Sequence, residues 1–68
     1  MLSGSRRGPY AYLRQALYEY QAENEFEISI VEGDVMIVDH MDEDGWYSGW
    51  NEKTGKFGRF PSNYTEKL

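Results

Sequence analysis

Residues 16–34 carry the pattern that decides the fold, ALYEYQAENEFEISIVEGD. The stretch begins with a short apolar and aromatic run, continues through a segment rich in glutamate, and ends in EISIV followed by a Gly-Asp turn. Short apolar runs bounded by turn residues are typical of β-strands, and an acidic segment between two such runs is typical of a surface loop. The stretch therefore predicts strands over residues 16–20 and 27–30, joined by an acidic loop.

Three further runs have the same character and predict strands over residues 35–39, 46–51 and 56–60, with a turn at 52–55 between the last two. No window carries the periodic apolar stripe of a helix, and glycines interrupt every candidate, at positions 33, 45, 49, 55 and 58. The fold class is thus predicted to be all-β, with five short strands in a small antiparallel barrel or sandwich. Its core is predicted from the apolar strand positions, which are Ile28, Ile30, Met36, Val38 and Phe60.

Length and charge suit one small binding domain. The chain has 68 residues, no cysteine and a net charge of −5. A domain of this size buries only about 60% of its unfolded surface, so there is room for one core. Residues 1–14 contain three arginines and no acid, and they are rich in Gly and Ser. We therefore expect a flexible flanking segment over residues 1–12, a folded domain over 13–68, and an acidic surface on the folded part.

The same composition argues against several partners and locations. The few basic residues are scattered, whereas nucleic-acid binding requires a basic stripe. No apolar run approaches the roughly 20 residues of a membrane helix, and a signal peptide is lacking. We expect a cytoplasmic protein, without membrane insertion, that behaves as a monomer when isolated.

An enzymatic function is not favoured by the candidate residues. Two carboxylate pairs, Glu25 with Glu27 and Asp42 with Asp44, lie in predicted loops of a domain too small for a deep cleft. His40 has no nucleophile or second histidine near it in the sequence. Neither a calcium-loop pattern nor a phosphate-binding glycine loop is present. The sequence predicts no catalytic residue, no metal site and no cofactor.

Four motifs in order carry a family resemblance: ALYEY at 16–20, EISIVEGD at 27–34, GWYSGW at 45–50 and FPSNY at 60–64. Together they resemble the Src-homology-3 (SH3) domain family over residues 16–66. The resemblance implies a five-stranded barrel of two packed sheets that binds proline-rich peptides in the polyproline II conformation. Such a peptide has three residues per turn and presents apolar ridges that suit slots between aromatic rings.

The resemblance also implies which residues bind the peptide. Tyr18 and Tyr64 would wall one proline slot, and Tyr64 would be shared with the next. The second slot would contain Tyr20, Trp46 and Pro61. Asn63, with the Tyr64 hydroxyl and the Trp46 indole N–H, would donate to ligand carbonyls. A tyrosine in a small β domain is otherwise a strand former on a half-buried face, and that alternative applies to Tyr18 and Tyr20.

Specificity is predicted to come from the acids of the first loop. Glu25 and Glu27 occupy positions where the family holds the arginine or lysine that flanks the prolines. On an extended segment their spacing would direct both carboxylates to the same side. The alternative is that the acids are only a solvated surface. In that case specificity would come from Phe26 or from the acidic residues Asp42, Glu43 and Asp44.

Two further residues depart from the family pattern. Arg59 stands where an apolar residue is common, and it would narrow the adjacent slot or repel a cationic ligand end. Trp50 shares a strand face with Trp46 and Ser48, and we expect a secondary contact there.

The sequence therefore predicts a non-catalytic module that recruits proline-rich segments, of the PxxP type with a flanking Arg or Lys, in signalling or cytoskeletal assemblies. The alternative is a structural domain that docks a folded partner or a second copy through Trp50 and the acidic residues 42–44.

Overall fold

The computed structural model describes residues 12–68, which form an all-β domain. Its elements are β1 (Tyr12–Ala16), β2 (Val35–Met41), β3 (Trp46–Asn51), β4 (Phe57–Pro61), the 3-10 turn η2 (Ser62–Tyr64) and β5 (Thr65–Lys67). No α-helix occurs in this part of the chain. The predicted flanking segment over residues 1–12 lies outside the described residues, apart from Tyr12, which begins β1.

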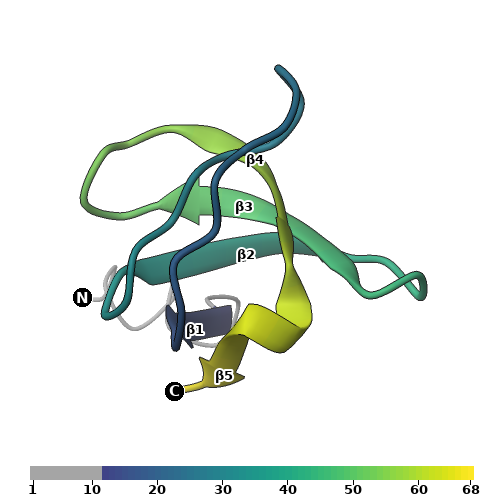
Figure 1. Cartoon of the computed structure of the whole chain (residues 1–68). Coiled ribbons are helices and arrows are strands. Elements are labelled where there is room, and N and C mark those ends of the chain that lie inside the picture. Colours follow the sequence, from purple (N-terminus) through teal and green to yellow (C-terminus); the bar gives the residue numbers. More distant parts are fainter. Residues whose placement is uncertain (1–11) are drawn as a thin grey trace, which may run out of the picture.

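All neighbouring strands are antiparallel, and their order is β4-β3-β2-β1-β5. Figure 1 shows β2, β3 and β4 side by side, with β1 and β5 below them and the first loop, residues 17–34, rising past β4. The first loop pairs with the outer edge of β4, because Ile28 N–H donates to the Arg59 carbonyl and Arg59 N–H donates to the Phe26 carbonyl, both at 2.9 Å. The loop therefore covers a strand edge that would otherwise expose unpaired backbone groups.

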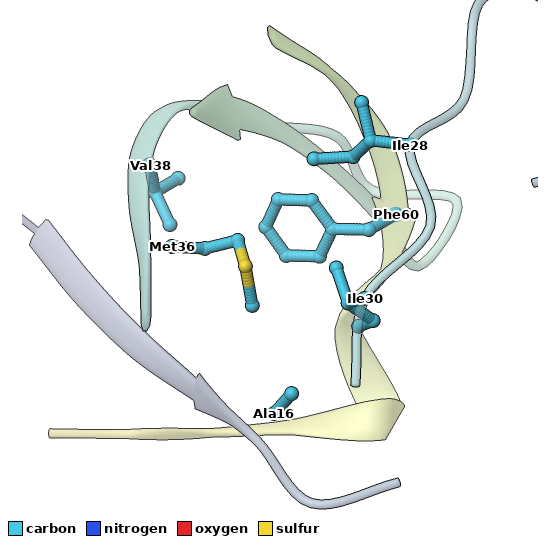
Figure 2. Close-up of a cluster of buried hydrophobic side chains, with 6 residues drawn as sticks. All are labelled: Ala16, Ile28, Ile30, Met36, Val38 and Phe60. Carbon is cyan, nitrogen blue, oxygen red and sulfur yellow. The ribbon is translucent and has the colours of Figure 1, made fainter. Parts of the chain in front are cut away.

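The core lies on the concave side of this sheet. It consists of six buried apolar residues, Ala16, Ile28, Ile30, Met36, Val38 and Phe60. The Phe60 ring points between the two isoleucines of the first loop and Met36 of β2 (Figure 2). All five predicted core positions are confirmed, and Ala16 joins them. Each large apolar side chain buried in this way contributes about 1.5–3 kcal/mol.

The first two predicted strands are wrong in extent. β1 ends at Ala16, where the first strand was expected to begin, because the chain bends at Leu17 and Tyr18. Residues 27–30 also form no named strand. They contact the rest of the fold through isolated bridges, between Ile30 and Tyr20 and between Glu27 and Arg59. The fifth strand is instead β5, which the sequence analysis did not predict.

The three other predicted strands match β2, β3 and β4 to within two residues. Gly49 allows two of them to approach. A Cβ atom at this position would collide with the backbone carbonyl of Ile37 on β2, so only glycine fits at the crossing. Gly49 therefore serves packing.

A buried polar pair joins the turns at one end of the sheet. The Asp34 carboxylate accepts hydrogen bonds from the Val31 N–H at 3.0 Å and from the Asn51 side-chain amide at 2.9 Å. The Asn51 side-chain oxygen accepts in turn from the Lys53 N–H at 2.9 Å. Buried polar groups are tolerated when they are hydrogen-bonded in this way. The pair couples the turn before β2 to the turn after β3.

Candidate functional site

Four aromatic side chains form a continuous surface row, in the order Tyr18, Tyr64, Tyr20 and Trp46. Neighbouring ring centroids are 5.8, 5.7 and 5.8 Å apart, and each pair meets edge to face. Such pairs are favourable because the positive edge of one ring faces the negative face of the next. The tertiary structure thus brings together four of the six predicted peptide-binding residues, from the first loop, β3 and η2. We call these four side chains the aromatic row.

Pro61 and Asn63 lie beside the aromatic row. Pro61 is buried and pairs across the sheet with Trp46. Asn63 is exposed in the centre of η2, next to Tyr64. Because Asn63 is exposed, its side-chain amide faces solvent. All six predicted residues therefore belong to one region of the surface.

Arg14 supports Tyr64, the residue of the aromatic row that lies in η2. This role of Arg14 was not predicted from the sequence. Its guanidinium donates to the Thr65 hydroxyl at 2.6 Å and to the Thr65 carbonyl at 2.9 Å, and it lies 5.3 Å from the centre of the Tyr47 ring. The Thr65 hydroxyl donates to the Ser62 carbonyl at 2.7 Å, which closes η2. Arg14 therefore links β1 to the turn that positions Tyr64. The only sequence signal was a cation between the apolar residues Leu13 and Ala16.

The Tyr20 hydroxyl donates to the Glu27 carboxylate at 2.6 Å. This hydrogen bond, followed by weaker effects of burial and nearby acids, raises the pKa of Tyr20 to about 12. The Glu27 carboxylate also accepts from the Glu23 N–H at 2.8 Å and from the Asn24 amide at 3.3 Å. The Tyr20 hydrogen bond is the main cause that lowers the pKa of Glu27. Glu27 is therefore ionised and holds the loop against the aromatic row.

The expected extended geometry of Glu25 and Glu27 is wrong. The Glu27 N–H donates to the Asn24 carbonyl at 3.2 Å, and residues 24–26 form a turn. The expectation that both carboxylates point to the same side of an extended segment consequently does not apply. Glu25 is exposed at the turn, whereas Glu27 is half-buried and engaged with Tyr20. The two acids therefore differ in environment, and Glu25 is the more accessible one.

Arg59 lies beside Trp46, at one end of the aromatic row. Its guanidinium contacts the Asp44 carboxylate at 3.0 Å and the Asp42 carboxylate at 3.3 Å, and it lies 5.6 Å from the centre of the Trp46 ring. The Asp44 carboxylate also accepts from the Trp46 N–H at 3.0 Å. That backbone hydrogen bond, with a further contribution from Arg59, lowers the pKa of Asp44. Arg59 therefore joins β4 to the turn before Trp46.

The remaining predicted contacts are exposed. Phe26 is 70% exposed at the tip of the first loop, and Glu43 is exposed in the turn between β2 and β3. Trp50 is 42% exposed, and its ring meets that of Phe57 on β4 with the centroids 4.7 Å apart. Strand pairing places Trp50 and Phe57 opposite each other, as it does Ser48 and Arg59. Trp50 is thus separate from the aromatic row.

The surface of the described residues is open and has no enclosed site. Residues 12–68 form no pocket, and they contain no group of three or more His, Asp or Glu side chains placed to hold a metal ion. Residues 12–68 contain no helix with the length and apolar character needed to cross a membrane. The aromatic row is therefore an open surface suited to an extended ligand.

The fold and the aromatic row define a small all-β domain with an open aromatic surface. The SH3 domain family model matches residues 15–62, and the chain belongs to the SH3 domain family. SH3 domains are non-catalytic modules that bind peptides. The family resemblance, the all-β fold class and the non-enzymatic character that were predicted from the sequence are thereby confirmed.

Relatives in both sequence and structure agree with this assignment. The chain is 44% identical to human sorbin and SH3 domain-containing protein 2 over 54 residues, which are 79% of this chain and 5% of that protein. It is 48% identical to drebrin-like protein B of Xenopus laevis, with 79% and 14% covered. The chain thus spans only a small part of the length of these relatives.

Among solved structures, the chain is similar to the C-terminal SH3 domain of myosin IB from Entamoeba histolytica. The TM-score is 0.78 at 33% identity, with 85% of this chain and 86% of that chain covered. The same myosin domain bound to an EhFP10(GEF) peptide gives a TM-score of 0.78 at 34% identity, with 85% and 93% covered.

Proposed function

We propose that this domain binds proline-rich peptides of the PxxP type, in the polyproline II conformation, across the aromatic row. The row itself is the observation that carries the proposal, because its ring-to-ring spacing of 5.7–5.8 Å continues from Tyr18 to Trp46 without interruption. One proline-containing ridge packs between Tyr18 and Tyr64. The next packs between Tyr64 and Trp46, over Tyr20 and against Pro61.

Polar groups beside the row complete the recognition. A polyproline II helix has no internal hydrogen bonds, so its carbonyls require external donors. The Asn63 amide, the Tyr64 hydroxyl and the Trp46 indole N–H are donors of the required type. The Tyr20 hydroxyl is committed to Glu27 and serves instead to orient its ring.

A flanking arginine or lysine of the peptide pairs with the first loop. Glu25 is exposed, and the Glu27 oxygen that receives only the Asn24 amide, at 3.3 Å, has capacity for another donor. Arginine is preferred to lysine because its planar guanidinium forms two parallel hydrogen bonds with a carboxylate.

The domain recruits its partner weakly and reversibly, as a monomer in the cytoplasm. Its relatives belong to signalling and cytoskeletal proteins, and a similar myosin IB domain has been solved with a peptide bound. Interfaces under about 1,200 Å² are typical of transient signalling contacts. The module acts in a signalling or cytoskeletal assembly, where additional contacts raise the effective affinity.

Titration of the isotopically labelled domain with a proline-rich peptide tests this function. We expect amide and indole resonances of the aromatic row, η2 and the first loop to shift together with one dissociation constant. A scrambled peptide of equal composition, with its prolines out of the PxxP spacing, is the control. Shifts confined to other surfaces, or none with either peptide, contradict the proposed function.

A second function, assembly through another surface, is favoured by one observation. Leu13, Ile37, Trp50 and Phe57 are successive cross-strand partners from β1 to β4, and three of them are exposed. An apolar stripe of this kind is a candidate contact with a folded partner or a second copy. Sedimentation that depends on protein concentration, and that Trp50→Ser removes, supports assembly. A constant monomer mass rules out self-association.

A further inference from the structure

The acidic side of the aromatic row already holds a cation, which is Arg59. Its guanidinium lies 3.0 Å from Asp44, 3.3 Å from Asp42 and 5.6 Å from the centre of the Trp46 ring. An aromatic face bordered by two carboxylates is the environment that an arginine side chain favours, through ion pairing and cation–π attraction. Arg59 therefore uses the contacts that a ligand cation beside Trp46 would need.

Each carboxylate oxygen of the two aspartates already has a partner within the chain. One oxygen of Asp42 contacts His40 Nε2 at 2.8 Å, and the other contacts Arg59. One oxygen of Asp44 accepts from the Trp46 N–H at 3.0 Å, and the other accepts from Arg59. Within the described residues each of these four oxygens thus has a partner. A peptide cation arriving here has to displace Arg59 or meet its positive charge.

Glu25 presents a different environment. It is exposed at the tip of the first loop, whereas the Arg59 guanidinium makes its ion pairs with Asp42 and Asp44. Acidic residues therefore lie in two regions, the first loop and the 42–44 turn. Among the described residues Arg59 forms ion pairs with the turn only, and its charge also contributes to the lowered pKa of Glu27.

We infer that Arg59 is a specificity-determining residue, which occupies the cation position beside Trp46 and thereby restricts the domain's selection of basic peptides. The inference rests on the proposed function and refines it. The preferred ligands are proline-rich peptides with a neutral or acidic residue at the position that faces Trp46 and the 42–44 turn. When such a peptide has a flanking cation, this cation pairs with Glu25. Without the Arg59 charge, the same surface selects an arginine at that position.

The ion pairs of Arg59 are partly exposed, with 40% of its side chain accessible. Exposed pairs are weak and are screened by salt, so the change in selectivity is moderate. The measured quantity is the ratio of the dissociation constant of a peptide with a neutral residue facing Trp46 to that of a peptide with arginine there. We expect Arg59→Gln to raise this ratio roughly two- to five-fold, which corresponds to exposed ion-pair energies.

Three variants make the experiment specific. Lys53→Gln removes one positive charge from the exposed turn after β3 and controls for net charge. Arg59→Lys retains the charge and should leave the ratio nearly as in the wild type. Adding Asp42→Asn and Asp44→Asn to Arg59→Gln should cancel the gain. Thermal unfolding of each variant verifies that it is folded, since the Arg59 backbone, and not its side chain, pairs with the first loop.

The outcomes distinguish the inference from the function on which it rests. A ratio that rises in Arg59→Gln, stays unchanged in Lys53→Gln and returns with the aspartate substitutions supports the role of Arg59. An unchanged or lower ratio in Arg59→Gln, or an equal rise in Lys53→Gln, overturns it while peptide binding itself stands. Failure of both peptides to bind the wild type and every folded variant overturns the proposed function and this inference together.

Discussion

The Tyr20 hydroxyl donates a hydrogen bond of 2.6 Å to the Glu27 carboxylate, which joins the centre of the aromatic row to the acidic first loop. Tyr20 also contacts Tyr64 on one side and Trp46 on the other. The position of the loop and the shape of the binding face are consequently linked. A change in the ionisation of either partner should therefore affect stability and binding together.

The loss of folding stability at acidic pH should depend on Tyr20. The hydrogen bond from Tyr20 is the first cause that lowers the pKa of Glu27 below its ordinary value of 4.5. A lowered pKa in the folded state contributes stability that is present above pH 4.5 and is lost as the pH falls through the folded value. We expect Tyr20→Phe to raise the pKa of Glu27 and to reduce this loss. Denaturation by urea between pH 2 and about 7, with NMR titration of Glu27, measures both. An unchanged pKa of Glu27 in the variant contradicts the assignment.

Alkaline pH should act on the same hydrogen bond with the opposite sign. The pKa of Tyr20 is raised from 10.0 to about 12, so the folded state retains a proton that the unfolded chain releases. The contribution is fully present below pH 10.0 and is lost as the pH rises through about 12. We expect the ultraviolet titration of the folded wild type to contain one late tyrosine that Tyr20→Phe removes. If Tyr20→Phe leaves the late ionisation step in place, the hydrogen bond is absent in solution.

Removal of the Trp46 side chain should abolish most peptide binding. The ring contacts both Tyr20 and Arg59, and central aromatic residues of an interface typically contribute about 2 kcal/mol or more. Stability should change far less than in Ile30→Ala, where a core cavity costs about 2–5 kcal/mol. Calorimetric titration and urea denaturation measure the two effects.

Trp50→Ala is the matched control for Trp46, since it removes the same side chain from the same strand outside the aromatic row. Its peptide affinity should remain near that of the wild type. Equal losses in the two variants, or an unfolded Trp46→Ala domain, would show that the binding face is misassigned.

The loop acids should contribute modestly and with a dependence on salt. Replacing Glu25 and Glu27 with glutamine should lower the affinity for an arginine-flanked peptide, by about 0.2–1 kcal/mol per contact, and flatten its salt dependence. Glu25→Gln alone should have most of the binding effect, because Glu27 is engaged with Tyr20. Affinity is measured at low and high salt. Parallel salt curves for the wild type and the double variant would mean that these acids are only a solvated surface.

Arg14 should stabilise both the fold and the binding face. Arg14→Met keeps the aliphatic part of the side chain but removes the hydrogen bonds to Thr65 at 2.6 and 2.9 Å. We expect a loss of about 1–3 kcal/mol in the free energy of unfolding, typical of unsatisfied polar partners, and a weaker affinity because η2 loosens. Lys67→Met, on the exposed part of β5, is the control. Equal stability of the two variants would contradict a supporting role for Arg14.

The sequence by itself determined the strands β2, β3 and β4 and the core. Residues 35–38 form a continuous apolar run, which is a local property that predicts a strand without knowledge of the partner strand. The structure buries Met36 and Val38 of this run. The residues of the aromatic row could also be named in advance, because the ordered motifs carry the family resemblance. The prediction that these residues lie on one surface came from the fold that the motifs imply.

Tertiary structure alone decided the limits of β1, the partner of Glu27 and the roles of Arg14 and Arg59. A strand was predicted to begin at Ala16, but β1 ends there, since the chain bends at Leu17 and Tyr18 and Ala16 pairs with Thr65, far along the chain. Likewise, Arg14 meets Thr65, and Arg59 meets Asp42 and Asp44, across separations of 51, 17 and 15 residues. Local pattern records whether a residue is apolar or charged, but the partner of a charge depends on which distant segments the fold brings within a few ångströms, where short-range hydrogen bonds and ion pairs form.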